Sequence, residues 1–252
     1  MTDILLSGCN GKMGRVITAC AAERDDCRIV AGIDLNTQQT AGYPVFDCPE
    51  HVDVKADVII DFSHPSVVSP LLQYAKANKI PAVIATTGLS EDQIADLKAA
   101  AAEIPIFFSA NMSIGVSLLL ELAKAATRVL GSSFDIEIVE MHHNQKLDAP
   151  SGTALMLADG ISAEMDHTMH YEYDRHAKRC KREKNEIGIH AVRGGTIVGE
   201  HEVIFAGHDE IVKLSHSARS KEIFAVGAVN AAVYLHTKGP GLYCMADLVA
   251  GK

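Results

Sequence analysis

The chain has 252 residues, of which 48% are apolar and 22% are charged. This balance excludes a disordered chain, which would be poor in apolar residues, and the 19 glycines show no collagen-like period. A chain of this length is expected to fold as one large domain or two small ones. The formal net charge of −9 argues against nucleic acid or an anionic membrane as a partner.

No apolar run approaches the roughly 20 residues that a membrane span requires. The N-terminal residues enter an apolar strand directly, without a basic segment before it, so we expect no signal peptide. The six cysteines are scattered and form no C-x-x-C pair. This pattern indicates reduced thiols in a cytoplasmic protein, and we expect neither a disulfide framework nor a metal site.

The first 110 residues alternate between apolar strands and amphipathic helices. Strands are predicted at 4–6, 28–33, 56–60, 82–85 and 104–108. Helices are predicted at 15–23, at 66–78, and from an N-cap at Ser90 to about residue 103. Continuous apolar strands that alternate with helices indicate an α/β domain with a parallel sheet covered on both faces.

The pattern changes after residue 110. We predict a long apolar helix at 114–130, a strand at 134–141 in which apolar and acidic residues alternate, and a helix at 151–164. The segments 186–192, 196–205 and 210–217 read as strands with no helix between them, which indicates an α+β domain with a mixed or antiparallel sheet. The segment 223–235 is predicted to be the final helix and to return to the first domain.

A glycine-rich turn, G-C-N-G-K-M-G at residues 8–14, joins the first predicted strand to the first helix. Backbone N–H groups at such a helix start hold a pyrophosphate, whose charge the helix dipole stabilises. The spacing is G-x-x-G-x-x-G, because Asn10 occupies the usual second-glycine position. Asp34 ends the second strand, where an acidic side chain accepts hydrogen bonds from a ribose. Nucleotide binding is therefore favoured over a plain strand–helix turn.

The same acid bears on the choice of cofactor. Asp34 would repel a 2′-phosphate unless a cation were near, and the next residue is Leu35. The pattern favours NADH, although Lys12 and Arg15 leave NADPH open. The rest of the crevice is expected at the strand ends 61–63, 85–88 and 109–112, where ordinary turn chemistry is the alternative.

The densest group of polar residues is H-H-N-Q-K-L-D-A-P-S-G-T at 142–153. The S-G-T residues open a helix and offer N–H and hydroxyl donors to an anion, which indicates a dicarboxylate pocket. His142 or His143 is suited to general acid catalysis near neutral pH. A plain N-cap at Ser151 is one alternative. Metal binding is the other, although neighbouring histidines on a strand point to opposite faces.

The segment 140–154, EMHHNQKLDAPSGTA, resembles the E-x-H-H-x-x-K-x-D-x-P-S-G-T-A signature of the 4-hydroxy-tetrahydrodipicolinate reductase (dihydrodipicolinate reductase) family. GCNGKMGR at 8–15, DFSHP at 61–65, TTG at 86–88 and NMSIG at 111–115 are also similar to that family. So are RGG at 193–195, VGEH at 198–201 and GLYCMAD at 241–247. The resemblance covers nearly the whole chain.

The resemblance implies NAD(P)H-dependent reduction of the cyclic product of aspartate semialdehyde and pyruvate to tetrahydrodipicolinate, in the diaminopimelate route to lysine. It implies a Rossmann-like dinucleotide-binding domain, here expected at 1–111 and 220–252. A domain at 112–219 is expected to bind the substrate and, through its mixed sheet, to build a homotetramer.

The resemblance also implies roles for single residues. His142 is expected to donate the proton that completes the reduction, and Lys146 to act as a second catalytic or substrate-binding group. The substrate carboxylates are expected to be held by His143, Lys146, Ser151, Gly152 and Thr153. The cofactor is expected to contact Gly8, Cys9, Asn10, Gly11, Lys12, Met13, Asp34, Ala85, Thr86, Thr87, Ser109, Ala110, Asn111 and Met112. Two departures are Leu35, where some members carry arginine, and Ala85, where glycine is frequent.

Three other functions remain open at this point. The first is a different nicotinamide-dependent reductase of a small carboxylate, and the second is a dinucleotide sensor without catalysis. The third is a metal hydrolase that uses the histidines. The segment 175–184, RHAKRCKREK, holds six basic residues and is expected to be a solvated helix or loop surface.

Overall fold

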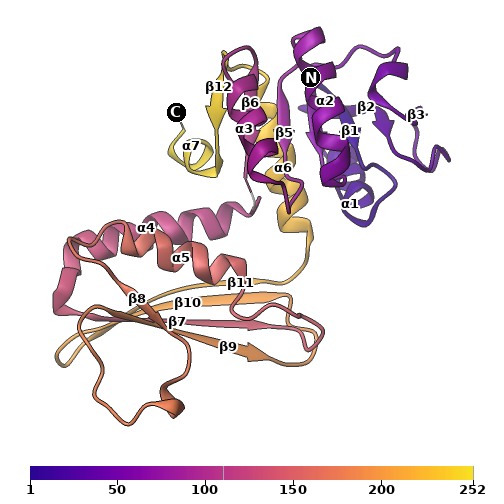
Figure 1. Ribbon diagram of the computed structural model, residues 1–252. Helices are drawn as coiled ribbons and strands as arrows, with labels where there is room; N and C mark the ends of the chain where they lie inside the picture. Colours follow the sequence, from indigo (N-terminus) through magenta and orange to yellow (C-terminus); the bar gives the residue numbers. More distant parts are fainter. Residues whose placement is uncertain (110, 252) are drawn as a thin grey trace. The chain divides into compact units, whose positions relative to one another are not determined.

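The computed structural model describes residues 1–109 and 111–251, and the chain divides into two compact units (Figure 1). The first unit consists of residues 1–114 and 221–252, and the second of residues 115–220. The second unit is therefore inserted into the sequence of the first. Among the described residues, no helix is long and apolar enough to cross a membrane.

The first unit contains a seven-stranded sheet in which every neighbouring pair of strands is parallel. The strand order is β12-β6-β5-β4-β1-β2-β3. The strands are β1 (Thr2–Ser7), β2 (Cys27–Ile33), β3 (Val45–Phe46), β4 (Val58–Asp61), β5 (Ala82–Ile84), β6 (Pro105–Phe108) and β12 (Gly241–Tyr243). The predicted Rossmann-like sheet is confirmed.

Helices cover both faces of this sheet (Figure 1). Ile59 and Ile60 are neighbours in β4 and both are fully buried, but in different cores, because successive strand side chains point to opposite faces. Ile60 belongs to the core with α1 (Lys12–Ala22) and α6 (Glu222–Leu235). Ile59 belongs to the core with α2 (Pro65–Asn78) and α3 (Glu91–Ala100).

The predicted N-cap of α3 is confirmed in detail. The Oγ of Ser90 accepts a hydrogen bond from the Gln93 backbone N at 3.2 Å, and the Gln93 side-chain oxygen accepts one from the Ser90 N at 3.0 Å. These reciprocal bonds form a capping box, which satisfies two backbone donors at the start of the helix.

The second unit contains a five-stranded mixed sheet in the order β11-β10-β7-β9-β8. Its strands are β7 (Asp135–His142), β8 (His170–Glu172), β9 (Glu186–Arg193), β10 (Gly199–Ala206) and β11 (Ile211–Ala218). The pairs β7–β9 and β8–β9 are parallel, whereas β10 is antiparallel to both of its neighbours. Helices α4 (Ile114–Leu130) and α5 (Gly152–Ser162) lie on one face (Figure 1). The predicted α+β architecture is confirmed.

The elements that the sequence did not predict are short. Helix α6 is not the last helix, because β12 and α7 (Met245–Ala250) follow it. Strands β3, β8 and β12 have only two or three residues, which is too few for a two-residue period to be recognised. Each of them lies at an edge of its sheet, where one neighbouring strand is enough to define it.

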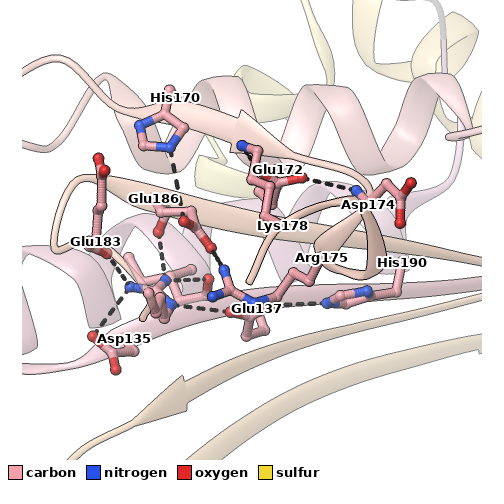
Figure 2. A network of polar contacts seen from close by, with 12 residues as sticks. Asp135, Glu137, His170, Glu172, Asp174, Arg175, Lys178, Glu183, Glu186 and His190 are labelled. Atoms are coloured by element: carbon pink, nitrogen blue, oxygen red, sulfur yellow. Dashed lines mark hydrogen bonds and ion pairs between the residues drawn. The ribbon is translucent and has the colours of Figure 1, made fainter. Parts of the chain in front are cut away.

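The basic segment 175–184 runs along the face of the second sheet that α4 and α5 leave uncovered (Figure 2). Arg182 anchors it, with a side chain that is only 17% exposed. Its guanidinium donates to Glu137 Oε1 at 3.0 Å, to Asp135 Oδ1 at 3.1 Å and to the Ile136 carbonyl at 2.9 Å. The segment is therefore tied to β7 at three points.

Other basic residues of the segment are paired as well. Arg175 donates to Glu186, and Lys178 to Glu172, both of which are buried carboxylates (Figure 2). Lys184 lies 4.0 Å from Asp135. The prediction of a solvated surface did not include these ion pairs, whose partners lie on β7, β8 and β9.

Replacing the anchor should loosen the whole segment. We expect Arg182→Ala to speed amide hydrogen exchange of residues 175–184 by about tenfold or more, because hydrogen bonds to charged groups each contribute roughly 1.5–3 kcal/mol. The exposed neighbour Lys181 provides a matched control, and Lys181→Ala should leave exchange unchanged. The exchange rates are measured by mass spectrometry. If residues 175–184 exchange as slowly in Arg182→Ala as in Lys181→Ala, the anchoring role is contradicted.

Candidate active site

Two cavities lie where the strands of the first unit end. One of about 270 Å³ is lined by Ser7, Gly8, Gly11, Ile33, Asp34, Leu35, Asp47, Phe62, Ser63, His64 and Val67. The other, of about 320 Å³, is lined by Met13, Phe62, Ser63, Ala85, Thr86, Thr87, Met112 and Phe224. Phe62 and Ser63 line both, so the cavities adjoin. Their position at the carboxyl ends of parallel strands is where α/β sheets bind ligands.

The glycine turn is shaped by close backbone contacts. Gly8 has a φ of +78°, and a Cβ placed there would lie 2.7 Å from the Phe62 carbonyl oxygen. A Cβ on Gly14 would lie 2.2 Å from the carbonyl oxygen of Gly8. Gly11 precedes α1 without a side-chain cap, so no side chain of the N-cap covers the N–H groups of the first turn. This arrangement fits a pyrophosphate.

Asn10 and Asp34 tie this turn to the loop after β2. Both oxygens of Asp34 accept backbone hydrogen bonds, from the N atoms of Asn10 and Asn36, each at 3.0 Å. The Asn10 side chain donates to the carbonyls of Asn36 at 2.6 Å and Gln38 at 3.0 Å, and accepts from the Thr40 hydroxyl at 2.7 Å. A glycine at position 10 would make none of these side-chain bonds.

A buried carboxylate organises the wall of the larger cavity. Asp61 is fully buried at the end of β4 and accepts hydrogen bonds from the Ser63 and Thr86 hydroxyls, each at 2.6 Å. The Thr86 oxygen also accepts from the Ser63 backbone N at 3.1 Å. Burial raises the pKa of Asp61, and the hydrogen bonds from the hydroxyls offset only part of that effect. The Thr86 hydroxyl is thus engaged within the protein.

The structure brings only some of the predicted cofactor residues together. Gly8, Gly11 and Asp34 line the smaller cavity, and Met13, Ala85, Thr86, Thr87 and Met112 line the larger one. Cys9, Asn10, Lys12, Ser109 and Asn111 line neither, and the Cys9 thiol is buried beside Gly32. Ala110 lies outside the described residues. Leu35, Asp47 and Phe224 line the cavities without having been predicted as site residues.

The second unit gathers its polar residues around Glu140, which is fully buried on β7. Arg193 of β9 donates two hydrogen bonds to the carboxylate, Nη1 to Oε2 at 2.8 Å and Nη2 to Oε1 at 2.7 Å. The Ser151 backbone N donates to Oε1 at 3.0 Å, and His142 Nδ1 lies 2.6 Å from Oε2. Burial alone would raise the pKa of Glu140, but the hydrogen bonds from Arg193, His142 and Ser151 together lower it.

His142 stands at the end of β7 and is 9% exposed. Its ring meets that of His201 edge to face, with centroids 5.3 Å apart. The Nε2 atom faces Gly199, where a Cβ would lie 3.1 Å away. His201 Nε2 lies 3.1 Å from the Ser151 hydroxyl oxygen, which accepts the backbone N–H of Ala154 and so caps α5.

The other predicted substrate residues surround this group. Ser151 is the N-cap of α5, and Gly152 and Thr153 form its first turn, as expected for an anion site. Lys146 pairs with Asp148 at 2.8 Å, and Arg193 Nη2 donates to the Asp148 carbonyl at 2.7 Å. His143 follows β7 and is half-buried. Ser151 therefore caps α5, as the N-cap alternative expects, and Glu140 and His142 lie beside the same helix start.

Three residues of this group received no role from the sequence: Glu140, Arg193 and His201. All three lie within segments that resemble the family, so a signal was present. For Glu140 there is a second signal, because a two-residue period places it on the apolar face of the strand with Ile136 and Ile138.

The burial of His201 has a consequence for stability. Burial, followed by the nearby charge of His142, lowers the pKa of His201 to about 4. The unfolded chain binds a proton below pH 6.5 while the folded chain does not, so stability is complete above pH 6.5 and is lost as the pH falls towards 4. The loss should reach about 3 kcal/mol. Urea unfolding at several pH values should show that His201→Gln removes this slope, whereas His208→Gln, at an exposed position, should retain it.

Comparisons with known proteins match both units of the chain. A family model described as dihydrodipicolinate reductase, N-terminus, matches residues 2–112, and one described as dihydrodipicolinate reductase, C-terminus, matches residues 115–249. A 4-hydroxy-tetrahydrodipicolinate reductase from Caldanaerobacter subterraneus subsp. tengcongensis is 52% identical over 99% of this chain and 98% of its own. One from Clostridium novyi (strain NT) is 47% identical over 100% of both chains.

A solved structure shares the fold. The dipicolinate-bound dihydrodipicolinate reductase from Paenisporosarcina sp. TG-14 superposes with a TM-score of 0.81 at 27% identity and covers 97% of both chains. The two family models together span almost the whole chain, as do the relatives. The chain belongs to the dihydrodipicolinate reductase family.

Proposed function

We propose that the chain reduces 4-hydroxy-tetrahydrodipicolinate to tetrahydrodipicolinate with a reduced nicotinamide cofactor, in the diaminopimelate route to lysine. The observation that carries the proposal is the group around Glu140. It combines a histidine suited to proton donation, a lysine and a helix N-terminus suited to carboxylates in one unit. The same group argues against a dinucleotide sensor, which would not need it.

The first unit would hold the cofactor. The turn at Gly8–Met13 would bind the pyrophosphate, Asp34 the adenosine ribose, and the cavity lined by Thr86 and Met112 the nicotinamide. Ser109, Ala110 and Asn111 would complete the contacts through the turn after β6. When bound, the reduced nicotinamide supplies a hydride to the substrate ring.

The second unit would bind and protonate the substrate. His143, Lys146, Ser151, Gly152 and Thr153 would hold the two carboxylates through charge and through N–H and hydroxyl donors. His142 would donate a proton to the ring position that gains electron density as the hydride arrives, which is general acid catalysis. The role of the protein in this step is to orient the ring and place the proton donor.

The smaller cavity favours NADH over NADPH. Asp47 lines it together with Asp34, so two carboxylates would face a 2′-phosphate. The pKa of Asp47 is lowered by its hydrogen bond with His51. Arg15, which the sequence offered as a counter-charge, donates through Nε to the Asn10 carbonyl at 3.1 Å.

We further propose a homotetramer in the cytoplasm. On the face of the second sheet opposite α4 and α5, beyond the basic segment, the apolar side chains of Val192 and Ile211 are 43% and 62% exposed, which favours contact with further copies. The scattered cysteines suit a reducing compartment. Light scattering of the purified protein measures the assembly directly.

The reaction is tested by a coupled assay with aspartate semialdehyde, pyruvate and the synthase that precedes this step. NADH oxidation should require the synthase and should be inhibited by pyridine-2,6-dicarboxylate. His142→Gln should lower kcat on the order of 100-fold with little change in KM, because general acid catalysis contributes 10²–10⁴-fold. Lys146→Ala should lower kcat and raise KM, whereas His208→Gln should resemble the wild type.

Each outcome of this assay decides between functions. Full turnover in His142→Gln would remove it as the proton donor. If NADH binds but no oxidation depends on the synthase, the chain is either a reductase of another small carboxylate or a sensor. Turnover of a panel of such acids would identify the reductase, and its absence would identify the sensor.

The cofactor preference is tested at Asp34. Asp34→Asn should lower kcat/KM for NADH by roughly tenfold or more, because hydrogen bonds to a charged acceptor contribute about 1.5–3 kcal/mol. The kcat/KM for NADPH should fall less or rise, so their ratio should shift at least about tenfold towards NADPH. Asp53→Asn makes the same charge change at an exposed position and should leave the ratio unchanged. An unchanged ratio in Asp34→Asn would contradict the assignment.

A further inference from the structure

We propose that Glu140 is a positioning residue for His142. By holding a proton on Nδ1, it lets the protonated imidazole deliver its Nε2 proton, and the ring is left as the neutral Nδ1–H tautomer. Arg193 holds the Glu140 carboxylate in the required place. This inference rests on the proposed function, in which His142 is the proton donor.

The first step is geometric. Glu140 and His142 are two residues apart on β7, so their side chains leave the same face of the strand. The 2.6 Å distance from His142 Nδ1 to Glu140 Oε2 is that of a short, charge-assisted hydrogen bond. A bond of this kind selects one of the two neutral tautomers and one ring orientation, as does the carboxylate beside the histidine in a catalytic triad.

The second step concerns the charge of Glu140. The hydrogen bonds that lower its pKa keep the group ionised at neutral pH, and an ionised carboxylate only accepts hydrogen bonds. Nδ1 must therefore donate, whether or not the ring carries a second proton. The atom left for proton exchange is Nε2, which faces Gly199, a residue that contributes no side chain.

The third step is what holds the carboxylate. Arg193 pairs with His142 across the parallel β7–β9 register and donates to both oxygens of Glu140. A bidentate bond of this kind fixes the plane of the carboxylate as well as its position. Arg193 also donates to the Asp148 carbonyl, so the same guanidinium restrains the loop that carries Lys146.

The other titratable neighbours leave the pairing undisturbed. His201 of β10 packs its ring against His142 and stays neutral near pH 7, because burial lowers its pKa to about 4. The charge of Lys146 is balanced by Asp148 at 2.8 Å. His216, on β11, is also neutral near pH 7 because burial lowers its pKa. Among the described residues of the sheet, Arg193 is the one cation other than a protonated His142 that contacts Glu140.

A purely structural role for Glu140 is separable from this one. Glu140 also accepts the Ser151 N–H, so its loss could simply displace the start of α5. Displacement of that helix start would weaken substrate binding and raise KM. Loss of the tautomer would leave binding intact and lower kcat.

The decisive experiment combines ¹⁵N NMR of the histidines with kinetics of Glu140→Gln. In the wild type, His142, assigned by its absence in His142→Gln, should be the Nδ1–H tautomer. In Glu140→Gln, whose carboxamide both donates and accepts, that preference should be lost. The kcat should fall roughly 10- to 100-fold, with KM changed less than about threefold and the Kd for NADH unchanged.

Glu137→Gln is the matched control on the same strand. Glu137 pairs with a histidine and an arginine too, His190 at 2.7 Å and Arg182 at 3.0 Å, but on the opposite face. We expect its kcat to stay within about twofold of the wild type. This comparison separates the position of Glu140 from the general effect of removing a carboxylate from β7.

The results that would refute the role of Glu140 differ from those that would refute the proposed function. An Nε2–H tautomer in the wild type would overturn the inference even if Glu140→Gln failed to fold. A rise in KM at unchanged kcat would overturn it by assigning Glu140 to the helix start alone. A wild type without synthase-dependent turnover would refute the proposed function, and the tautomer of His142 in the wild type and Glu140→Gln would still decide whether Glu140 positions it.

Discussion

A carboxylate inside a protein must find hydrogen-bond donors or lose its charge, and each unit of this chain is organised around one such group. Glu140 lies on β7 in the second unit and Asp61 at the end of β4 in the first, and both are fully buried. Several of the donors that satisfy them, among them His142, Ser151 and Thr86, belong to segments that the proposed function uses. The burial of these two groups therefore sets the positions of the candidate site residues.

The two carboxylates are satisfied by different chemistry. Glu140 is held by a guanidinium, an imidazole and a backbone N–H, and its pKa is lowered despite burial. Asp61 is held by two neutral hydroxyls, and burial raises its pKa. A fixed charge beside His142 suits a group that must carry a proton. Asp61 fixes the Ser63 and Thr86 hydroxyls, which lie at the wall of the larger cavity.

Strand β7 shows why part of the site was predictable. Its two-residue period places Ile136 and Ile138 in the core, and the same face continues into Glu140 and His142. The opposite face carries Asp135 and Glu137, which bind the basic segment. The strand and the parallel sheet of the first unit could be read from spacing, and the signature of 140–154 from its resemblance to the family. Glu140, an acidic residue in phase with the buried isoleucines, is a further signal of the site in the sequence.

The roles that the sequence did not reveal depend on contacts between distant segments. Arg193 and Glu140 are 53 residues apart, and Arg182 and Glu137 are 45 apart, so no local period links them. Asn10 was predicted to contact the cofactor at the usual position of a glycine, whereas its side chain anchors a loop 26 to 28 residues away. In each case the residue type suits its partner. The planar guanidinium of an arginine donates to a carboxylate, and the side-chain amide of Asn10 donates to two backbone carbonyls. Because the folding of distant segments against one another creates these pairs, the fold had to be known before the individual polar residues acquired a function.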